Sequence, residues 1–333
     1  MSTRTSEEIQ YAVRAAVEAA VRAPSVHNTQ PWSFGTQGEE IILRGDAERM
    51  LPTGDPAGRE LLISCGAALC NLRLTALALG YRPVTRVLPD PDRPSVLATV
   101  RLGDAVGRDE HIMLLHAEIE RRHTHRADFA DLELPRPFVD ALSREAAAEG
   151  ARLTPVRAEP AVRTLAALTR AAQEVQAQDT AFSLELLRWS RAPESTRPDG
   201  VPAGAYPARP AGAPAEDFAR RDYARGRPWG YRRDSVGAAD DSPGVVTLLT
   251  TPGDSRENWI TAGCGLQRAL LFASAYGVSA AFHTQPLEFF HLREFIRQEL
   301  CSGEPPQMIV RFGVTPDRPA TPRRPLTEVF PLD

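Results

Sequence analysis

Two kinds of apolar pattern recur along the chain. Residues 6 to 22 repeat apolar side chains at helical spacing, which predicts an amphipathic helix. Residues 59 to 79 and 256 to 276 are apolar on almost every side, which is typical of a buried helix. Each run is followed by a glycine, Gly80 or Gly277, as helix C-termini commonly are. The two long runs are therefore predicted to be core helices.

Shorter segments complete the pattern. Further helices are predicted over residues 112–122, 135–150 and 160–178. Short apolar runs predict strands at residues 41–43, 84–88, 96–102, 153–156, 245–250 and 308–312. Because helices and strands are mixed along the whole chain, we predict an α+β fold.

Two distant parts of the chain resemble each other. RELLISCGAALCNLRLTALALG, at residues 59–80, aligns without a gap to RENWITAGCGLQRALLFASAYG, at 256–277, with Arg, Glu, Ile, Leu, Leu, Ala, Ala and Gly at the same offsets. Each segment is followed by a similar strand end, VRLG at 100–103 and VRFG at 310–313. We interpret this as an internal duplication. Two fused copies pack like the subunits of a dimer, so the long apolar helices are expected to meet at the centre.

The predicted copies divide the chain into residues 1–110 and 111–333, and the second copy carries an insertion at about 191–243. The insertion is rich in Pro, Gly, Ala and Arg, and a loop of this length in a compact domain is either functional or disordered. Its aromatic residues argue against simple disorder: Tyr206, Phe218, Tyr223, Trp229 and Tyr231. We favour a lid over a pocket, and a disordered insertion is the alternative.

Composition narrows the classes of function. The net charge of -4 gives no electrostatic basis for binding nucleic acid or an anionic membrane. The chain has no lysine, so any anion site must use arginine, histidine or backbone N–H groups. The cysteines and histidines form no zinc pattern, and Cys65 and Cys70 lie in an apolar helical run as reduced core cysteines do. We expect a cytoplasmic protein without a metal.

The segment APSVHNTQPW, at residues 23–32, gathers neutral hydrogen-bonding side chains directly after the first predicted helix. Two interpretations are open. These residues can be ordinary turn residues, or they can form the edge of a pocket for a flat, polar heterocycle.

Three other segments are candidates for binding. RRHTHRADF, at 121–129, surrounds Thr124 with guanidinium groups that match the geometry of a phosphate, although cations at a helix C-terminus are usually solvated. TPRRPLTEVF, at 321–330, adds two arginines in a tail between prolines. FHTQPLEF, at 282–289, follows the second long helix, and its alternative reading is a turn between helices.

The combination of these segments resembles a known family. APSVHNTQPW resembles the APS-x-x-N-x-QPW signature of the nitroreductase (NADH oxidase/flavin reductase) family, and Arg122-x-Thr124-x-Arg126 resembles its RxSxR element. TPRRPL resembles the C-terminal basic element of that family. The first copy carries only the APS…QPW loop and the second only RxSxR, an arrangement similar to the fused Acg subfamily of actinobacteria. The resemblance implies a nitroreductase fold, one chain that mimics the homodimer, and one FMN under a lid.

The resemblance also implies roles for individual residues. Arg122, His123 and Thr124 would hold the FMN phosphate and ribityl chain, and Arg126 would lie toward the pyrimidine end of the ring. The tail would close on the phosphate through two arginines, Arg323 and Arg324. The first copy would approach the ring through Pro24, Ser25 and Val26, with the loop shaped by Asn28 and Gln30. A hydrogen bond near flavin N5 would come from the stretch of Thr284, Gln285, Pro286 and Leu287.

Two departures from the family pattern stand in this sequence. Thr124 replaces the usual serine of RxSxR, which keeps the hydroxyl group, and Gln285 stands where an acidic residue is usual near N5. The function implied is transfer of a hydride from NAD(P)H through FMN to a nitroaromatic, a quinone or a similar small acceptor. Because the flavin carries the chemistry, no catalytic side chain is predicted. The alternatives are a protein that sequesters FMN without turnover and a flavin dehydrogenase specific to one pathway.

Overall fold

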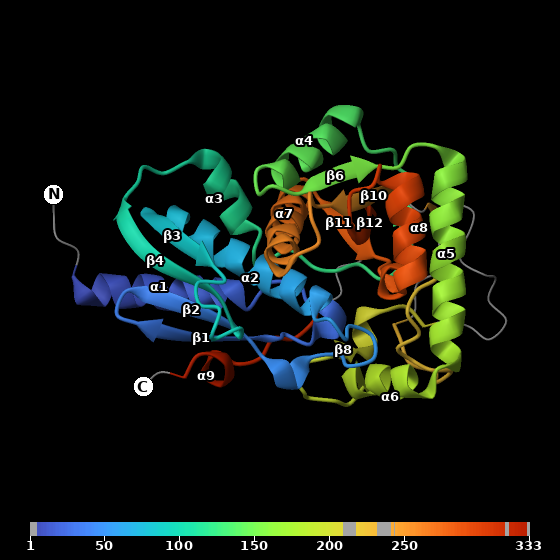
Figure 1. Cartoon of the computed structure of the whole chain (residues 1–333), viewed down its shortest axis with the longest axis horizontal. Coiled ribbons are helices and arrows are strands. Elements are labelled where there is room, and N and C mark those ends of the chain that lie inside the picture. The colour runs from blue at the N-terminus through green and yellow to red at the C-terminus, as the bar shows by residue number, and fades with distance from the viewer. Residues whose placement is uncertain (1–4, 209–217, 232–240, 243, 317–319, 332–333) are drawn as a thin grey trace.

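A computed structural model describes residues 5–208, 218–231, 241, 242, 244–316 and 320–331. Helices and two four-stranded antiparallel sheets lie side by side in it (Figure 1). The first half of the chain contributes α1 (Ser6–Ala20), β1 (Trp32–Gln37), β2 (Glu40–Gly45), α2 (Arg59–Ala78), β3 (Tyr81–Val87) and β4 (Val96–Ala105). The second half contributes α4 (Arg136–Ala147), β6 (Arg152–Pro155), β10 (Val245–Thr250), α7 (Arg256–Ala275), β11 (Val278–Phe282) and β12 (Pro306–Val314).

The two sheets repeat one topology. The first has the strand order β1-β2-β4-β3 and the second β6-β10-β12-β11, with antiparallel neighbours throughout. Among the elements named above, one helix and two strands precede the long helix of each half, and two strands follow it. The order of elements therefore repeats well beyond the aligned helix and strand.

Other elements connect or extend these units. The helices are α3 (Glu110–Ala117), α5 (Glu159–Gln178), α6 (Thr180–Trp189), α8 (Phe290–Leu300) and α9 (Leu326–Val329). The short strands are β5 (Phe129–Ala130), β7 (Ser190–Arg191), β8 (Val201–Pro202) and β9 (Asp241–Ser242). The 3-10 turns are η1 (Val26–Asn28), η2 (Ala47–Arg49), η3 (Ala203–Ala205) and η4 (Gln285–Glu288).

Helices α2 and α7 meet in backbone contact at the centre of the molecule. A Cβ atom added to Gly66 would lie 2.1 Å from the Ile260 carbonyl oxygen, and one added to Gly263 would lie 2.0 Å from that of Ile63. Only glycine permits so close an approach. The two glycines and the two isoleucines occupy equivalent places in the sequence alignment, so the contact is reciprocal, like that across a two-fold axis.

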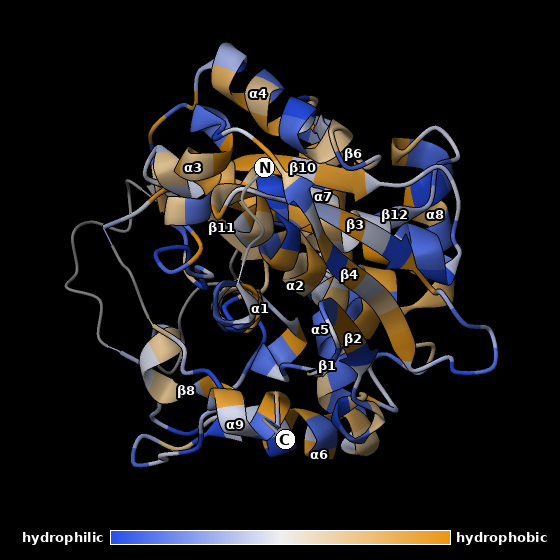
Figure 2. Cartoon of the chain, turned by 90° about the vertical axis from the view of Figure 1, so that its left-hand side faces the viewer, coloured by the Kyte–Doolittle hydropathy of each residue, from blue (hydrophilic) through white to orange (hydrophobic). Residues whose placement is uncertain are grey.

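One apolar core spans both halves. Buried side chains of α1, α2 and the first sheet are continuous with those of α4, α7 and the second. The outer helix α4 is amphipathic, and its ribbon alternates between orange and blue in Figure 2, with Val139, Leu142 and Ala146 buried. Among the described helices, α2 alone is long and apolar enough to cross a bilayer, and most of it is buried in this core. The four cysteines are free and buried, as expected for Cys65 and Cys70.

The predicted helix over 112–122 is wrong at its C-terminal end. Helix α3 ends at Ala117, and the chain that follows it pairs with β11 instead of continuing the helix. The His125 N–H donates to the Ala280 carbonyl at 2.8 Å, and Thr124 forms a parallel bridge with Ala280. The sequence patterns also missed β1, β11, α6 and α8.

The close contact between α2 and α7 predicts that a side chain at Gly66 lowers the stability of the protein. Gly66→Ala places a methyl group where the Ile260 carbonyl lies, so the free energy of unfolding should fall by about 3 kcal/mol or more. Gly107→Ala is the control, because a Cβ there meets no atom within 4 Å, and it should change stability by less than about 0.5 kcal/mol. Urea unfolding measures both, and equal midpoints for the two variants would contradict the contact.

Candidate functional site

A cavity lies between the two halves, with about 1270 Å³ of space including its solvent-filled mouth. The first half lines it with residues 24–27 and with one face of α2. The second half lines it with residues 124–126, with the last two residues of β11 and the two that follow them (281–284), and with part of β12. The insertion lines it with residues 206, 207 and 220–224. A concave site between packed units is where small ligands most often bind.

The structure separates the predicted site residues into two groups. The residues that line the cavity are Pro24, Ser25, Val26, Thr124, Arg126 and Thr284. The residues outside its lining are Asn28, Gln30, Arg122, His123, Gln285, Pro286, Leu287, Arg323 and Arg324. Arg122 and His123 border a smaller cavity of about 480 Å³. In the second group, hydrogen bonds to the loop, the insertion or the tail are made by Asn28, Gln30, Gln285, Arg323 and Arg324, as described below.

Three arginines converge beside the cavity without a carboxylate. The Arg122 and Arg323 guanidinium groups both donate to the Arg22 carbonyl, at 3.4 and 3.2 Å, and Arg126 donates to the Thr124 carbonyl at 3.4 Å. Within the described chain, no ion pair joins any of the three to an acidic side chain. The tail and the segment after α3 are thus brought together around a concentrated positive charge.

This cluster is electrostatically unfavourable as it stands. Burial and the neighbouring Arg126 lower the pKa of Arg122 to about 10. Burial and the charges of Arg122, Arg22 and Arg126 lower the pKa of Arg323 to about 9. The Nε atoms of Arg122 and Arg323 are buried and have no hydrogen-bond partner among the described residues. Unpaired donors and like charges together fit an anion, and guanidinium forks match a phosphate.

The loop after α1 has a strained backbone. His27, Asn28 and Gln30 have φ values of 47°, 56° and 51°, in the left-handed region that residues other than glycine rarely adopt. Such backbone persists only where surrounding contacts hold it. The Gln30 N–H donates to Ser25 Oγ at 2.9 Å, and the Val26 N–H donates to Ser64 Oγ at 3.3 Å on α2.

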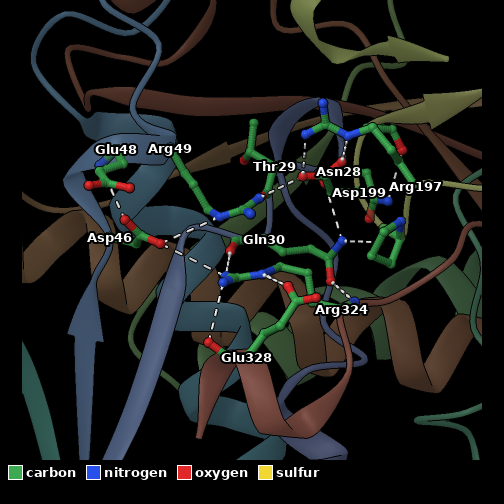
Figure 3. A network of polar contacts seen from close by, with 12 residues as sticks. Asn28, Thr29, Gln30, Asp46, Glu48, Arg49, Arg197, Asp199, Arg324 and Glu328 are labelled. Carbon is green, nitrogen blue, oxygen red and sulfur yellow. Dashed lines mark hydrogen bonds and ion pairs between the residues drawn. The ribbon is translucent and has the colours of Figure 1, made fainter. Parts of the chain in front are cut away.

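The amides of this loop bind the insertion and the tail. Asn28 Nδ2 donates to the Gly200 carbonyl at 2.9 Å, and Gln30 Nε2 donates to the Pro198 carbonyl at 2.8 Å. Arg323 donates to Asn28 Oδ1 at 3.0 Å, and the Arg324 N–H donates to Gln30 Oε1 at 2.8 Å. Asn28 and Gln30 therefore connect this loop to the insertion and to the tail (Figure 3), and their role in a flavin site stays a prediction.

Asp199 anchors the start of the insertion. Its buried carboxylate accepts hydrogen bonds from Arg191 at 2.7 Å, Arg49 at 3.1 Å and Arg197 at 3.2 Å. Arg49 also donates to the Thr29 carbonyl at 2.8 Å, which joins the anchor to the loop (Figure 3). Burial acts to raise the pKa of Asp199, but the hydrogen bonds from these arginines outweigh it and lower the pKa to about 2.

The second described part of the insertion forms a wall of the cavity. The Tyr223 hydroxyl lies 3.0 Å from His27 Nδ1 and is also hydrogen-bonded to Arg126. The ring of Tyr206 lies 5.7 Å from that of Tyr223, and the buried Tyr206 hydroxyl has no partner among the described residues. Arg221 pairs with Glu288 of η4. The insertion is therefore joined to both halves across the cavity.

The segment after β11 contributes one residue to the cavity and several to its support. Thr284 lines the cavity. Gln285 Nε2 donates to the Ala219 carbonyl of the insertion at 3.0 Å, so this amide binds protein backbone. Pro286 and Leu287 are buried, and Leu287 packs in an apolar cluster with Ile296. The expected hydrogen bond near N5 stays a prediction.

Sequence reasoning missed several residues that line the cavity. Glu60 and Ser64 lie one turn apart on the cavity-facing side of α2, where two polar residues four positions apart interrupt an apolar helix. This interruption of the apolar pattern could have indicated from the sequence that this side of α2 faces a polar site. His27 and Tyr223 left no such signal, because their meeting depends on how the loop and the insertion fold together. Among the described residues, no group of His, Cys, Asp and Glu could hold a metal ion.

Comparison with known proteins identifies the family. No family model matches the chain. "Putative NAD(P)H nitroreductase Rv3131" of Mycobacterium tuberculosis is 32% identical over 322 residues, which cover 95% of this chain and 90% of that protein. "Putative NAD(P)H nitroreductase acg" of the same organism is 29% identical, over 96% of this chain and 95% of that protein.

A solved structure shares the fold. A protein from Anabaena variabilis, described as a "putative nitroreductase", matches with a TM-score of 0.52 and 13% identity, over 94% of this chain and 90% of its own. Fold, chain coverage and sequence identity agree. This protein belongs to the nitroreductase family and, within it, to the Acg-type proteins.

Proposed function

We propose that the protein binds one FMN in the cavity between its halves and uses NAD(P)H to reduce a small acceptor such as a nitroaromatic or a quinone. The observation that carries the proposal is the group formed by Arg122, Arg126 and Arg323, which has no paired carboxylate among the described residues and adjoins a cavity large enough for a flat ring. The Nε atoms of Arg122 and Arg323, buried and without a partner in the described chain, are donors that a phosphate would satisfy.

The residues present fit this cofactor. Arg122 and Arg323 would hold the phosphate, with the hydroxyl of Thr124 beside Arg122 at 3.5 Å. Arg126 lines the cavity and would carry positive charge toward the ring. When bound, FMN accepts a hydride from a nicotinamide and passes it on. The protein would hold the ring between the strained loop and α2 and keep water from it.

We propose that the two halves act as the two subunits of a family homodimer. The shared strand order and the reciprocal contact of Gly66 and Gly263 support this. The loop at residues 24–27 comes from the first half, and residues 122–126 come from the second. Each of these two binding segments occurs once in the chain, so we expect one flavin site per chain.

We propose that the insertion is a lid. Its described residues Tyr206, Arg221 and Tyr223 line the cavity, and it is joined to both halves through His27 and Glu288. These contacts also support a second candidate function, in which the closed lid keeps FMN bound without turnover. Part of the expected lid, 209–217 and 232–240, lies outside the described residues.

The two candidates differ in whether a nicotinamide can reach the flavin. For an oxidoreductase, excess NADPH or NADH added without oxygen should bleach the visible flavin band at a rate that supports turnover. A band that resists both nucleotides and yet bleaches with dithionite would favour sequestration. A colourless protein that takes up no added FMN would refute both.

The arginine cluster predicts recognition of the phosphate. Arg122→Ala removes a charge-assisted contact worth about 1.5–3 kcal/mol, so the Kd for FMN should rise roughly 10- to 100-fold. Binding of riboflavin, which has no phosphate, should change little. Arg121→Ala is the matched control, because its exposed guanidinium pairs with Glu118. Fluorescence titration measures each Kd, and an equal loss for both flavins would contradict a phosphate site.

Asp199 predicts an acid-sensitive anchor. Its depressed folded pKa of about 2 means that its stabilisation is complete above the unfolded pKa of about 3.9 and is lost as pH falls through both values. Asp199→Asn should lower the free energy of unfolding at pH 7 by about 3 kcal/mol and remove this part of the decline below pH 4.

Glu194→Gln is the control for the anchor, because Glu194 lies exposed in the same insertion. It should unfold in urea like the wild type at every pH. A variant at Asp199 that did the same would show that the insertion is held by other contacts.

A further inference from the structure

Glu60 is a buried acid that faces the cavity. It lies in the first turn of α2, with a side chain 5% exposed, and it lines the cavity together with Ile63 and Ser64. Its Oε1 accepts a hydrogen bond from Arg59 at 3.2 Å. In the described chain, its other carboxyl oxygen has no hydrogen-bond partner, so one oxygen is available to a molecule in the cavity.

The equivalent residue of the second half has a different environment. Glu257 occupies the same place at the start of α7 but is exposed. The preceding Arg256 donates to the Pro94 carbonyl at the surface, whereas Arg59 is buried and donates to the Gln307 carbonyl at 2.6 Å. The same pair of residues is thus a surface feature in one half and part of the cavity in the other. Burying a carboxyl group costs free energy, so the burial of Glu60 in only one of the two halves suggests a role for it in the cavity.

The charges around Glu60 come from four elements. Arg59 lies on the same helix, Asp55 in the turn before it, Glu288 in η4 and Arg221 in the insertion. Burial and then the charge of Glu288 raise the pKa of Glu60, and the two arginines oppose them only in part, so that the pKa reaches about 8. Glu60 therefore carries a proton at neutral pH.

Three other titratable side chains that line the cavity, His27, His283 and Tyr206, are poorer proton donors. Burial and nearby arginines lower the pKa of His27 and His283 well below the usual range, so both rings are neutral. His283 Nε2 accepts from Arg311 at 2.8 Å. Burial raises the pKa of Tyr206 to about 12, which makes its hydroxyl a weak acid. Asp222 is exposed and accepts from the Arg225 N–H.

We propose that Glu60 is the acid that protonates an uncharged oxygen of the acceptor as the acceptor takes up a hydride. The proposal rests on the oxidoreductase function proposed above. In the reduction of a quinone, the hydride brings two electrons and one proton. The Glu60 O–H bond breaks and an O–H bond forms on the quinone oxygen, which completes the hydroquinone. The Glu60 carboxylate then regains its proton from water.

The proposal predicts a difference between acceptors that need a proton and acceptors that do not. Glu60→Gln should slow reduction of 1,4-benzoquinone about 10²- to 10⁴-fold at pH 7, the range expected for a general acid. It should also abolish the fall in rate that the wild type shows as pH rises through about 8. Reduction of ferricyanide, which takes one electron and no proton, should stay within about two-fold.

Two further variants complete the test. Glu60→Asp keeps a carboxylic acid but, with one methylene fewer, holds it farther from the cavity. This variant should therefore reduce benzoquinone more slowly and keep the pH dependence of the wild type. Glu257→Gln, the equivalent exposed position, should leave both acceptors unaffected. Glu60→Gln that reduces benzoquinone at the wild-type rate, with the wild-type pH profile, would overturn the proposal. Equal losses with both acceptors would overturn it as well, because they would indicate a structural role.

An infrared measurement tests Glu60 without turnover. The difference spectrum between the wild type and Glu60→Gln at pH 7 should contain the carbonyl band of a protonated carboxylic acid, and this band should disappear above about pH 8. An ionised carboxylate in that spectrum would overturn the proposal. If wild-type flavin is not reduced by NAD(P)H, the oxidoreductase function fails by itself, and the infrared band still reports whether Glu60 holds the proton.

Discussion

The backbone contact between α2 and α7 is the constraint on which the rest of the structure depends. Gly66 and Gly263 let each helix approach a carbonyl of the other at a distance that a side chain would forbid. That approach joins the two halves into one apolar core and sets the seam in which the cavity lies. Residues of both halves line the cavity because it lies in this seam.

Charge is distributed unevenly around this seam. At the anchor of the insertion, Asp199 is buried among three arginines that satisfy it. Beside the cavity, the opposite holds: Arg122 and Arg323 repel each other, and their buried Nε atoms are unpaired among the described residues. Removing a partner from a buried ion pair is costly, and a buried polar group without a hydrogen-bond partner costs free energy as well. The carboxylate at the anchor is therefore satisfied within the described protein, whereas the arginines beside the cavity are not.

The loop at residues 24–30 joins these two parts. Three of its residues have left-handed backbone, which the contacts with the insertion and the tail hold in place. One face of the loop lines the cavity, and its amides bind protein. The polar side chains of this loop are needed mainly for its shape.

The sequence by itself determined the two buried helices, the duplication and the family, because apolar periodicity and the binding segments are local patterns. It also predicted which segments would gather at the site. Only the tertiary structure decided which side chains reach the cavity. Glu60 and Glu257 each follow an arginine at the start of an aligned helix but have opposite burial, and Asn28 and Gln30 bind the insertion and the tail instead of lining the cavity. These outcomes depend on which distant segments meet, and a local pattern holds no information about that.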